Sequence, residues 1–365
     1  MDVSIIVPLY KGKKFINTIV QMIEKNREYI LNTSKEKETQ IEIIFVNDYP
    51  FENIIESDIP NSRISIILIT NENNYGIHKS RVNGLNRASG EYLLFLDQDD
   101  TIEDNYLESQ LECIKDADAV LCNGIFRGNK RIYSDMEFQK KVTTKEGYLN
   151  QKNIIISPGQ VLLKKNVIPK VWINNILKEN GSDDVLLWVL LLNNHIKWEI
   201  NFEQLYVHIE ESNNTSFNFK GMKKSVEELI YIIENKNFLT IEDTYILIKA
   251  LKNRIKKYNK YIEVLNDWET IIVNLIVQIK SNNYKIIALY GYGIIGKKLL
   301  FSLQASGIKI DVIIDKDAQN YQEKDKIIYT LEQVDKMIDM VIVTPLFEKD
   351  KILLNLKLSN NFKKV

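Results

Sequence analysis

The chain has 365 residues, which is long enough for two domains and a sizeable hydrophobic core. Its formal net charge is −1 at pH 7, so no overall basic field points to nucleic acid as a partner. Two cysteines, Cys113 and Cys122, are too few for a disulfide framework, and we expect reduced thiols in a cytoplasm.

The first hundred residues alternate between two patterns. Apolar runs of strand length are separated by segments whose apolar residues recur at helical spacing. The predicted strands cover residues 3–7 (stopped by Pro8), 41–46, 64–69 and 92–96, and the predicted helices cover 14–31 and 79–88. This alternation is typical of a parallel sheet with crossover helices, so we predict an α/β fold.

Acidic residues follow two of these strands. Asp48 comes just past the second strand, and the fourth runs directly into Asp97, Asp99 and Asp100. A sheet interior does not tolerate that charge, and ligands bind at the C-terminal ends of strands in open α/β sheets. Clustered carboxylates suit Mg²⁺ or Mn²⁺, which can carry the phosphates of a nucleotide. Taken alone, the acidic triplet is also explained as the N-cap of a helix starting at Ile102.

The next hundred residues contribute one more acidic site. We predict a helix over 105–115, a strand over 119–122, an irregular charged segment over 124–148, strand–turn–strand over 153–164, a helix starting at Asp183 and Asp184, a short strand over 204–208 and a polar loop over 210–218. Acids that follow separate strand or helix ends can converge on one crevice. Asp48, the Asp97/Asp99 pair and Asp184 are therefore expected to form one site.

Five stretches carry a resemblance to a known family. They are VSIIVPLY, IIFVND, NNYGIHKSRVNGLNRASGEYLLFLDQDD, ISPGQVLLKK and DDVLLW. In this order and spacing they resemble the family 2 glycosyltransferases with the GT-A fold, over residues 1 to about 215. The resemblance implies a metal-dependent, inverting enzyme that moves a sugar from a nucleoside diphosphate sugar, foremost a UDP-sugar, to a hydroxyl. The acceptor would be a glycan, or be linked to lipid or protein, in the synthesis of a surface glycan or polysaccharide.

The resemblance also implies contacts to the nucleotide sugar. Pro8 and Tyr10 match first-loop residues that touch the nucleotide base, and Asp48 matches the acid that hydrogen-bonds the base. Asn74 and Arg81 fall in the long central match, where Arg81 would face phosphate.

The metal and the chemistry are implied in the same way. Asp97 matches the acid near the ribose and the metal, and Asp99 matches the ligand of Mn²⁺ or Mg²⁺. Asp184 matches the general base, with Asp183 as its acidic neighbour. His208 lies where some GT-A enzymes add a metal ligand, although an ordinary structural histidine is an equally open reading.

Residues 219–282 have almost no proline or glycine and show helical spacing, which predicts two or three helices. Their charged segment KNRIKKYNK suits a solvated helix face or a peripheral contact with an anionic membrane.

A new unit begins near Tyr284. A strand over 285–290 leads into GYGIIG, followed by a helix over 297–305, a strand over 310–314 that ends at Asp315, and a strand over 340–343. Gly291, Gly293, Gly296 and Asp315 fit a dinucleotide-binding fingerprint in context, although the unit is about half a Rossmann domain. It resembles the small Rossmann-like domain of capsule-type nucleotide-sugar enzymes. A second nucleotide site and a role in packing or homo-oligomerisation both stay open.

The predicted organisation is therefore a GT-A domain over 1–218, a helical linker over 219–282 and a Rossmann-like domain over 283–365. MDVSIIVPLY lacks the basic start of a signal peptide, and no apolar run approaches the ~20 residues of a membrane span, so we expect a cytoplasmic protein, free or at the inner face of the membrane. Two rival functions are a bifunctional protein whose C-terminal domain modifies or senses sugar nucleotides, and a catalytically idle partner of another transferase.

Overall fold

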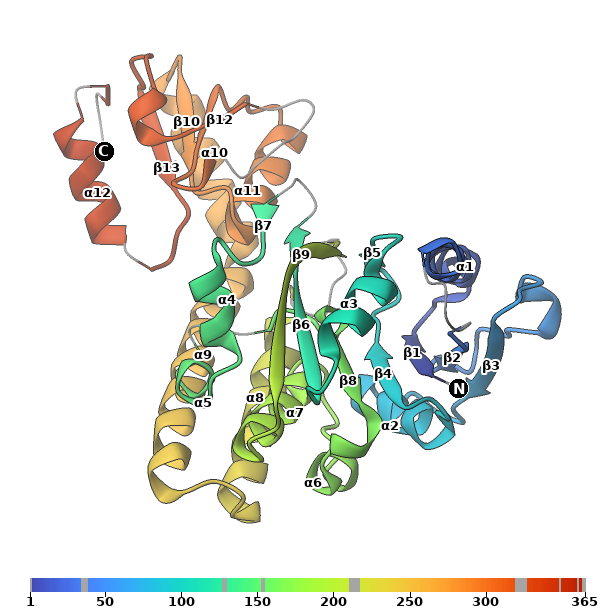
Figure 1. The fold of residues 1–365 in the computed structure, drawn as a ribbon. Coiled ribbons are helices and arrows are strands. Elements are labelled where there is room, and N and C mark those ends of the chain that lie inside the picture. Colours follow the sequence, from blue (N-terminus) through green and yellow to red (C-terminus); the bar gives the residue numbers. More distant parts are fainter. Residues whose placement is uncertain are drawn as a thin grey trace. The chain divides into compact units, whose positions relative to one another are not determined.

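The computed structural model describes residues 2–33, 39–126, 130–151, 155–209, 217–318, 327–347, 349–359 and 361–362 (Figure 1). By its internal contacts the chain divides into two compact units. The first covers residues 1–127 and 131–256, and the second covers 257–365 together with 128–130. The division into three domains stays a prediction.

The first unit is built on a mixed sheet. Its strands are β1 (Val3–Leu9), β2 (Ile41–Asn47), β3 (Ser65–Thr70), β4 (Tyr92–Phe95), β5 (Thr101–Ile102), β6 (Ala119–Phe126), β7 (Lys130–Arg131), β8 (Val161–Lys164) and β9 (Trp198–His208). They are ordered β3-β2-β1-β4-β8-β6-β9-β5, with β7 paired to β6. The first four strands are parallel, as predicted, and β8 then runs antiparallel to both β4 and β6. The predicted α/β class is confirmed.

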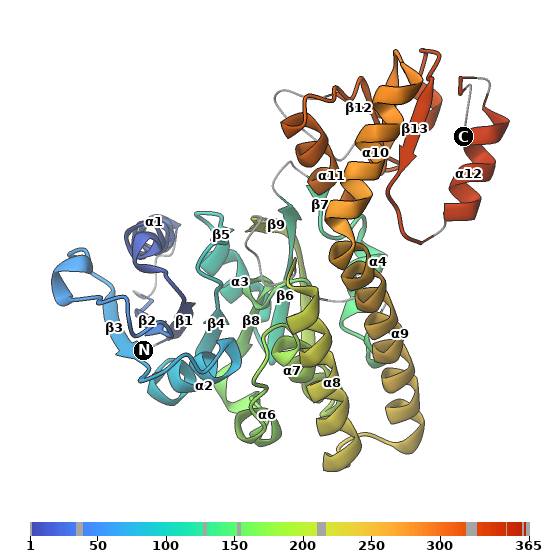
Figure 2. The same cartoon turned by 180° about the vertical axis from the view of Figure 1, so that it is seen from behind.

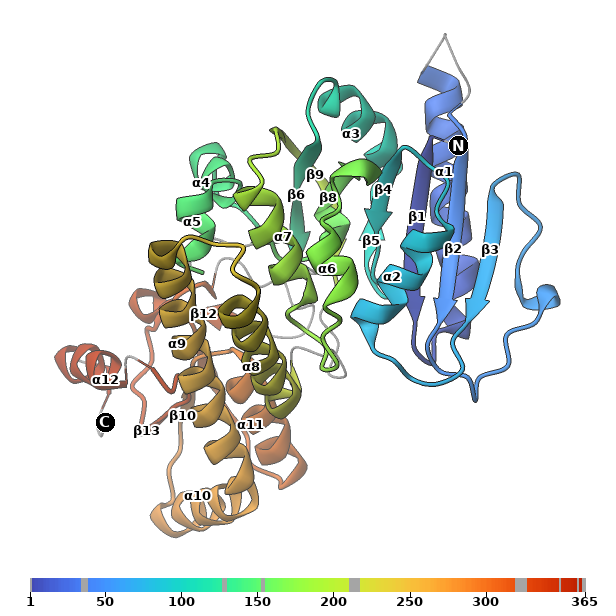
Figure 3. The same ribbon diagram turned by 90° about the horizontal axis from the view of Figure 1, so that it is seen from below.

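Helices α1 (Ile16–Thr33), α2 (Ile77–Arg87), α3 (Tyr106–Ile114) and α4 (Met136–Val142) contact strands of this sheet. The other helices up to residue 266 are α5 (Lys145–Leu149), α6 (Lys170–Asn174), α7 (Asp183–Asn193), α8 (Phe219–Lys236) and α9 (Ile241–Asn266), and α9 continues past residue 256 into the second unit. Short 3₁₀ turns are η1 (Lys13–Phe15), η2 (Glu56–Asp58), η3 (Pro158–Gln160) and η4 (Lys165–Val167). Successive strand side chains point to opposite faces. The odd-numbered residues of β1 accordingly join the core under α1 and α3, whereas α2 packs on the opposite face (Figure 3). A Cβ at Gly84 of α2 would lie 2.4 Å from Ile6 Cγ2, so glycine allows this close approach.

Pro8 does not end the first strand, contrary to the prediction. Ile6 accepts a hydrogen bond from Leu96 on the β4 side, and Leu9 accepts one from Asp48 on the β2 side. Since backbone groups alternate between the two sides, Pro8 faces the β4 side, where pairing stops at Ile6. Its missing N–H therefore removes no ladder bond, and β1 continues to Leu9.

Three further predictions were wrong. Residues 124–148 are not irregular, because Asp135 and Thr144 cap α4 and α5 by accepting hydrogen bonds from Phe138 N at 2.8 Å and Gly147 N at 3.1 Å. Residues 155–157 are not a strand, whereas 152–154 lie outside the described residues. β9 begins six residues earlier than the predicted strand, at Trp198. The alternative, in which the acidic triplet caps a helix starting at Ile102, is not observed, because Thr101–Ile102 form β5. Most of the predicted polar loop, 210–216, is outside the described residues.

The second unit is built on a small parallel sheet. It contains α10 (Trp268–Asn282), β10 (Ile287–Tyr290), α11 (Ile294–Ala305), β11 (Val312–Ile314), β12 (Ile328–Tyr329), the 3₁₀ turn η7 (Leu331–Gln333), β13 (Met340–Val343) and α12 (Lys349–Leu358). The strand order is β12-β11-β10-β13, and every pair is parallel. Ile287 and Leu289 of β10 face a core shared with α10 and α11, which lie side by side (Figure 2). The alternate residue, Ala288, faces a second cluster on the other side of the sheet.

The predicted helices of the middle region are confirmed as α8, α9 and α10. Within the described residues, none of the helices combines the length and the apolar character needed to cross a bilayer.

Candidate active site

A buried arginine connects two of the predicted acids. Arg81, on α2, places Nη2 2.6 Å from Asp97 Oδ1 and Nη1 2.6 Å from Asp183 Oδ2. Asp97 follows β4, and Asp183 is the first residue of α7. The guanidinium therefore connects the C-terminal end of a strand to the start of a helix that lies more than eighty residues later in the chain. The contact with phosphate that the family resemblance implied for Arg81 stays a prediction, since both terminal nitrogens are engaged by carboxylates in this structure.

The two acids at the start of α7 have different environments. Burial acts to raise the pKa of Asp183, but the charge and hydrogen bond of Arg81 outweigh it and hold the pKa below its usual value. Burial and the charge of Asp183 raise the pKa of Asp184 to about 7. Asp184 Oδ1 accepts a hydrogen bond from Val185 N at 2.7 Å, which fixes the carboxyl group on its own helix. Asp183 is thus a fixed anion, and Asp184 is suited to exchange a proton near neutral pH.

The turn after β4 gathers carboxylates. Burial, together with the charges of Asp100 and Asp97, raises the pKa of Asp99 to about 6. Burial also raises the pKa of Asp97, although Arg81 opposes this. Carboxylates that resist ionising beside one another make a site that a cation would stabilise.

Asp100 has a structural role. Its carboxylate accepts hydrogen bonds from Tyr206 Oη and, at 2.9 Å, from Ile209 N. His208 Nδ1 lies 3.1 Å from the same carboxylate. This nitrogen therefore faces Asp100, and a role for His208 as a metal ligand stays a prediction.

The fit of this site to a divalent cation can be judged from its donor atoms. Asp97 and Asp99 offer hard carboxylate oxygens of the kind that Mg²⁺ and Mn²⁺ prefer. Within the described residues, no three His, Cys, Asp or Glu side chains are grouped to hold a metal by themselves. Mg²⁺ is commonly bound by one or two carboxylates together with substrate phosphates, so the residues present fit a cation that arrives with a diphosphate.

Asp48 organises the loop that precedes α2. Its Oδ1 accepts hydrogen bonds from Asn71 Nδ2 at 2.7 Å and from Tyr75 N at 2.9 Å, and its Oδ2 accepts one from Gly76 N at 2.8 Å. Asn74 Oδ1 lies 3.2 Å from the same Gly76 N–H. Gly76 has φ +86°, a conformation that favours glycine. Asp48 thus shapes the loop, and its predicted contact with a base stays a prediction.

The first loop is anchored to the acidic turn. Gln98 Oε1 accepts a hydrogen bond from Tyr10 N at 2.9 Å, and Gln98 Nε2 donates one to Tyr10 O at 3.2 Å. The half-exposed Tyr10 ring meets Tyr49 edge to face, 5.2 Å between centroids, and Lys11 Nζ lies 5.2 Å from the Tyr49 centroid. Pro8 lies just before this loop, inside β1. A planar base could stack on such rings.

Sequence reasoning missed several supporting residues. Gln98 is the second residue of DQDD, and Ser157, whose Oγ lies 3.4 Å from Asp97 Oδ2, belongs to the stretch ISPGQ. Both motifs were recognised, but only the fold shows what these side chains contact. Trp172 Nε1 donates to Asp183 O at 2.8 Å, and nothing in the sequence near Trp172 indicates this.

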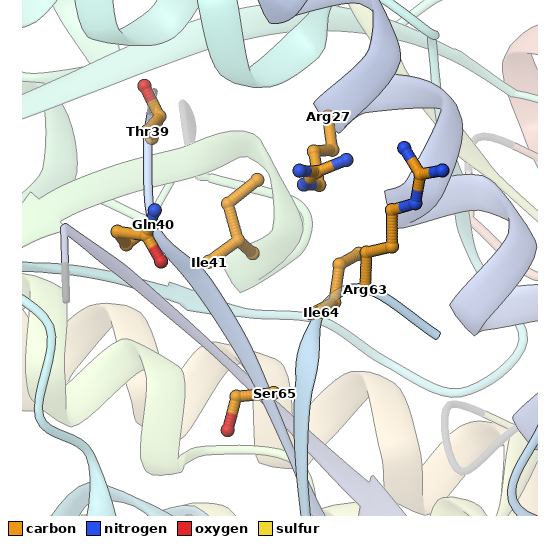
Figure 4. Close-up of a pocket in the computed structure, with 7 residues that line it drawn as sticks. All are labelled: Arg27, Thr39, Gln40, Ile41, Arg63, Ile64 and Ser65. Atoms are coloured by element: carbon orange, nitrogen blue, oxygen red, sulfur yellow. The ribbon is translucent and has the colours of Figure 1, made fainter. Parts of the chain in front are cut away.

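A small polar hollow lies at the opposite edge of the sheet. It has a volume of about 260 Å³ and is bordered by Arg27 and Arg63 on one side and Thr39 and Gln40 on the other (Figure 4). Because it is at the starts of β2 and β3, and the acids follow strand ends, it is not part of the candidate active site.

The predicted second site lies entirely within the second unit. Gly291, Gly293, Gly296 and Asp315 all line one cavity of about 530 Å³. Asp315 Oδ2 accepts a hydrogen bond from Tyr292 N at 2.7 Å and Oδ1 accepts one from Asp317 N at 2.9 Å, so its carboxylate holds the glycine turn. Its predicted contact with a ribose stays a prediction.

Residues 4–172 match the family model Glycosyl transferase family 2. An uncharacterized glycosyltransferase of Rickettsia bellii is 26% identical over 250 residues, 65% of this chain, and the match spans only 33% of that protein. An uncharacterized glycosyltransferase of Haemophilus influenzae is 23% identical, with 76% of this chain and 95% of the relative covered. The cholesterol galactosyltransferase of Borreliella burgdorferi is 23% identical, with 71% and 72% covered. Among solved structures, S. aureus TarS in complex with UDP-GlcNAc aligns with a TM-score of 0.47 and 17% identity, covering 70% of this chain and 72% of that one.

Proposed function

We propose that this chain, whose residues 4–172 match the Glycosyl transferase family 2 model, is a metal-dependent enzyme that transfers the sugar of a nucleotide sugar with inversion to an acceptor hydroxyl. The observation that carries this proposal is the contrast within the acid pair of α7. One terminal nitrogen of Arg81 binds Asp183 and the other binds Asp97 of the acidic turn, whereas the pKa of Asp184 is raised to about 7.

Asp99 and Asp97 are the residues that would hold the cation. When bound, a divalent cation neutralises charge that develops on the departing diphosphate. Asp97 is positioned for this by Arg81 on one oxygen and by Ser157 near the other. The raised pKa of Asp99 means that an adjacent positive charge would favour its ionised form.

Asp184 would act as the general base. The acceptor oxygen attacks the anomeric carbon as the bond from that carbon to the phosphate oxygen breaks. The hydroxyl proton passes to Asp184, and the bonding electron pair leaves with the diphosphate. Attack on the face opposite the leaving group inverts the configuration. A base with a pKa near the working pH suits this step, because a substantial fraction of it is ionised and the ionised form accepts a proton readily.

The nucleotide end of the donor would bind beside the first loop. Tyr10 and Tyr49 offer rings, Gln98 ties this loop to the acidic turn, and Asp48 shapes the neighbouring loop. UDP-sugars are the first donors to test. A glycan, a lipid-linked or a protein-linked acceptor, and a cytoplasmic location, belong to the same proposal.

The test is a screen of UDP-sugars for donor hydrolysis and transfer, with Mn²⁺, with Mg²⁺ and with EDTA. The product of an α-linked donor should be β-linked by proton NMR, and activity should vanish with EDTA and return with added cation. An α-linked product, or full activity in EDTA, would contradict the mechanism. The absence of turnover with every donor and acceptor, together with no nucleotide binding at the N-terminal domain, would favour the idle-partner alternative.

A further inference from the structure

The second unit contains a cavity that the transferase chemistry does not use. Its volume of about 530 Å³ falls in the range of small-molecule sites, roughly 300–1,000 Å³. The cavity is lined where strands end: by Gly291 after β10, by Asp315 after β11, and by Thr344 and Pro345 after β13. All of these strands are parallel, so their C-terminal ends meet at one edge of the sheet.

The sheet topology identifies this edge as a ligand position. Numbered along the unit, the four strands follow the order 3-2-1-4, because β12-β11-β10-β13 places the first strand between the second and the fourth. From β10 the chain adds β11 and β12 on one side and then β13 on the other side. Ligands of open α/β sheets bind where the strand order reverses in this way. The ends of β10 and β13, on the two sides of the reversal, both border the cavity. One such half of a doubly wound fold binds a mononucleotide.

The three glycines of the turn have different reasons to be glycine. Gly291 has φ +95°, and a Cβ on Gly296 would lie 1.9 Å from Gly291 O, so backbone conformation and close packing account for these two. Gly293 has φ −74° and ψ −165°, which any residue adopts, and a Cβ there would meet nothing within 4 Å. Neither packing nor strain requires glycine at 293. An absent side chain at this point leaves the backbone open to a ligand in the cavity.

The chemistry of the lining indicates the class of ligand. α11 starts directly after Gly293 without a side-chain cap, and the first residues of a helix carry N–H groups that have no partner within the helix. Ile294, Ile295 and Gly296 all border the cavity, where these groups and the helix dipole favour an anion. The Tyr261 ring lies on the same cavity and offers a surface on which a base can stack. Asp315 holds the turn in place through Tyr292 N.

We propose that this cavity binds a nucleoside diphosphate, with its phosphates at Gly293 and the first turn of α11. This site is independent of the donor site in the first unit and does not rest on the proposed transfer reaction. No chemical step is assigned to the ligand at this site, where it would act as a bound effector.

The test is hydrogen–deuterium exchange on the full chain with UDP or ADP, in EDTA, followed by mass spectrometry. Ligand at ten times its Kd should slow exchange about tenfold in peptides covering 290–297 and 344–346. Gly293→Glu should abolish this protection, because its side chain would enter the cavity with a negative charge. The matched control is Phe301→Glu, which adds the same charge on an exposed position of the same helix away from the cavity and should keep the protection.

Three outcomes would overturn the proposal. One is no protection of these peptides by millimolar UDP or ADP in the wild type. Another is protection that persists in Gly293→Glu. The third is protection by NAD⁺ that exceeds that by ADP at equal concentration, which would assign a dinucleotide. Peptides around Tyr10 and Asp97 report separately on the donor site, so failure of either proposal is visible without the other.

Discussion

Replacing each acid of the α7 pair by asparagine should change stability in opposite directions. Asn keeps the shape of Asp and removes its charge, so Asp184→Asn and Asp183→Asn form a matched pair at adjacent positions. Asp184 is held ionised at alkaline pH against burial and against a neighbouring anion. Asp183 is the ionised partner of a buried guanidinium. We therefore expect Asp184→Asn to stabilise the protein and Asp183→Asn to destabilise it.

The magnitude for Asp184 follows from its pKa. A rise from 3.8 to about 7 is roughly three units, or about 4 kcal/mol at ~1.36 kcal/mol per unit. The charge is shared with Asp183 and the Asp184 side chain is partly exposed. We therefore expect Asp184→Asn to raise the free energy of unfolding by about 2 kcal/mol. A pKa raised by folding gives stability that is present below the unfolded pKa and lost as pH rises through the folded pKa. The advantage of Asp184→Asn should therefore grow between about pH 4 and pH 7 and then level off.

The sign is reversed for Asp183. Its lowered pKa gives stability that is present above the unfolded pKa and lost as pH falls through the folded value. Asp183→Asn removes one of the two carboxylates that form ion pairs with Arg81, and removing a member of a buried ion pair costs roughly 3–5 kcal/mol.

The assay is urea unfolding of wild type and both variants at pH 5 and pH 8, with transfer rates measured in parallel. At pH 8, Asp184→Asn should be more stable than the wild type and lose about 10²-fold or more in transfer rate, with donor binding kept. Should Asp183→Asn prove the stabilising change, or should the advantage of Asp184→Asn not depend on pH, the assignment of roles within the pair would be refuted.

Further predictions concern the metal site, the first loops, the pH profile and the glycine turn. Asp99→Ala should lower transfer by about 100-fold or more and remove the shift in Tm that Mn²⁺ and donor produce together, because a cation ligand is lost; cation-independent turnover of this variant would count against the site. Asp48→Ala removes the acceptor of three hydrogen bonds and should weaken UDP binding measured by calorimetry, and an unchanged Kd would show that the 71–76 loop does not position the nucleotide. The kcat/KM for transfer should fall as pH drops below about 7, following protonation of Asp184, and a flat profile from pH 5 to 8 would exclude this base. Gly296→Ala should unfold the second unit at a lower temperature in calorimetry, because its Cβ would lie 1.9 Å from Gly291 O, whereas an unchanged transition would mean that the turn relaxes freely.

The sequence predicted the parts of the fold that depend on local pattern. Strands β1, β2, β4 and β11 are largely apolar and buried, and acids at the ends of β2, β4 and β11 mark where those runs must end. The sequence pattern did not predict elements whose extent is set by tertiary contacts or by helix caps. Residues 198–203 of β9 alternate between exposed and buried positions only weakly, and the strand begins at Trp198 because β6 pairs in parallel with residues 198–201. The short helices after Tyr133 depend on caps at Asp135 and Thr144 that are weak signals in a charged segment.

The candidate site was predicted as a set of residues but not as a set of contacts. Asp97 and Asp183 are 86 positions apart in the sequence, and only the fold shows that one guanidinium binds both. Likewise, Asp100 and His208 are brought together when β5 pairs with β9, which no local pattern announces. The residue types indicate which chemistry a site can support. Which side chains contact one another depends on distances that the sequence does not contain.

The balance of charge at the candidate site supports the proposed cation. Arg81 forms ion pairs with both Asp97 and Asp183, so its charge is shared between them. Asp99 and Asp184 are therefore left with raised pKa values, because burial and neighbouring anions oppose their ionisation. A diphosphate would add further negative charge to the same place, and its binding would be opposed unless positive charge came with it. A divalent cation beside Asp99 would offset both of these negative charges. On the proposed mechanism, the cation would then serve the diphosphate, and Asp184, whose carboxylate is not one of the two that Arg81 binds, would take the acceptor proton.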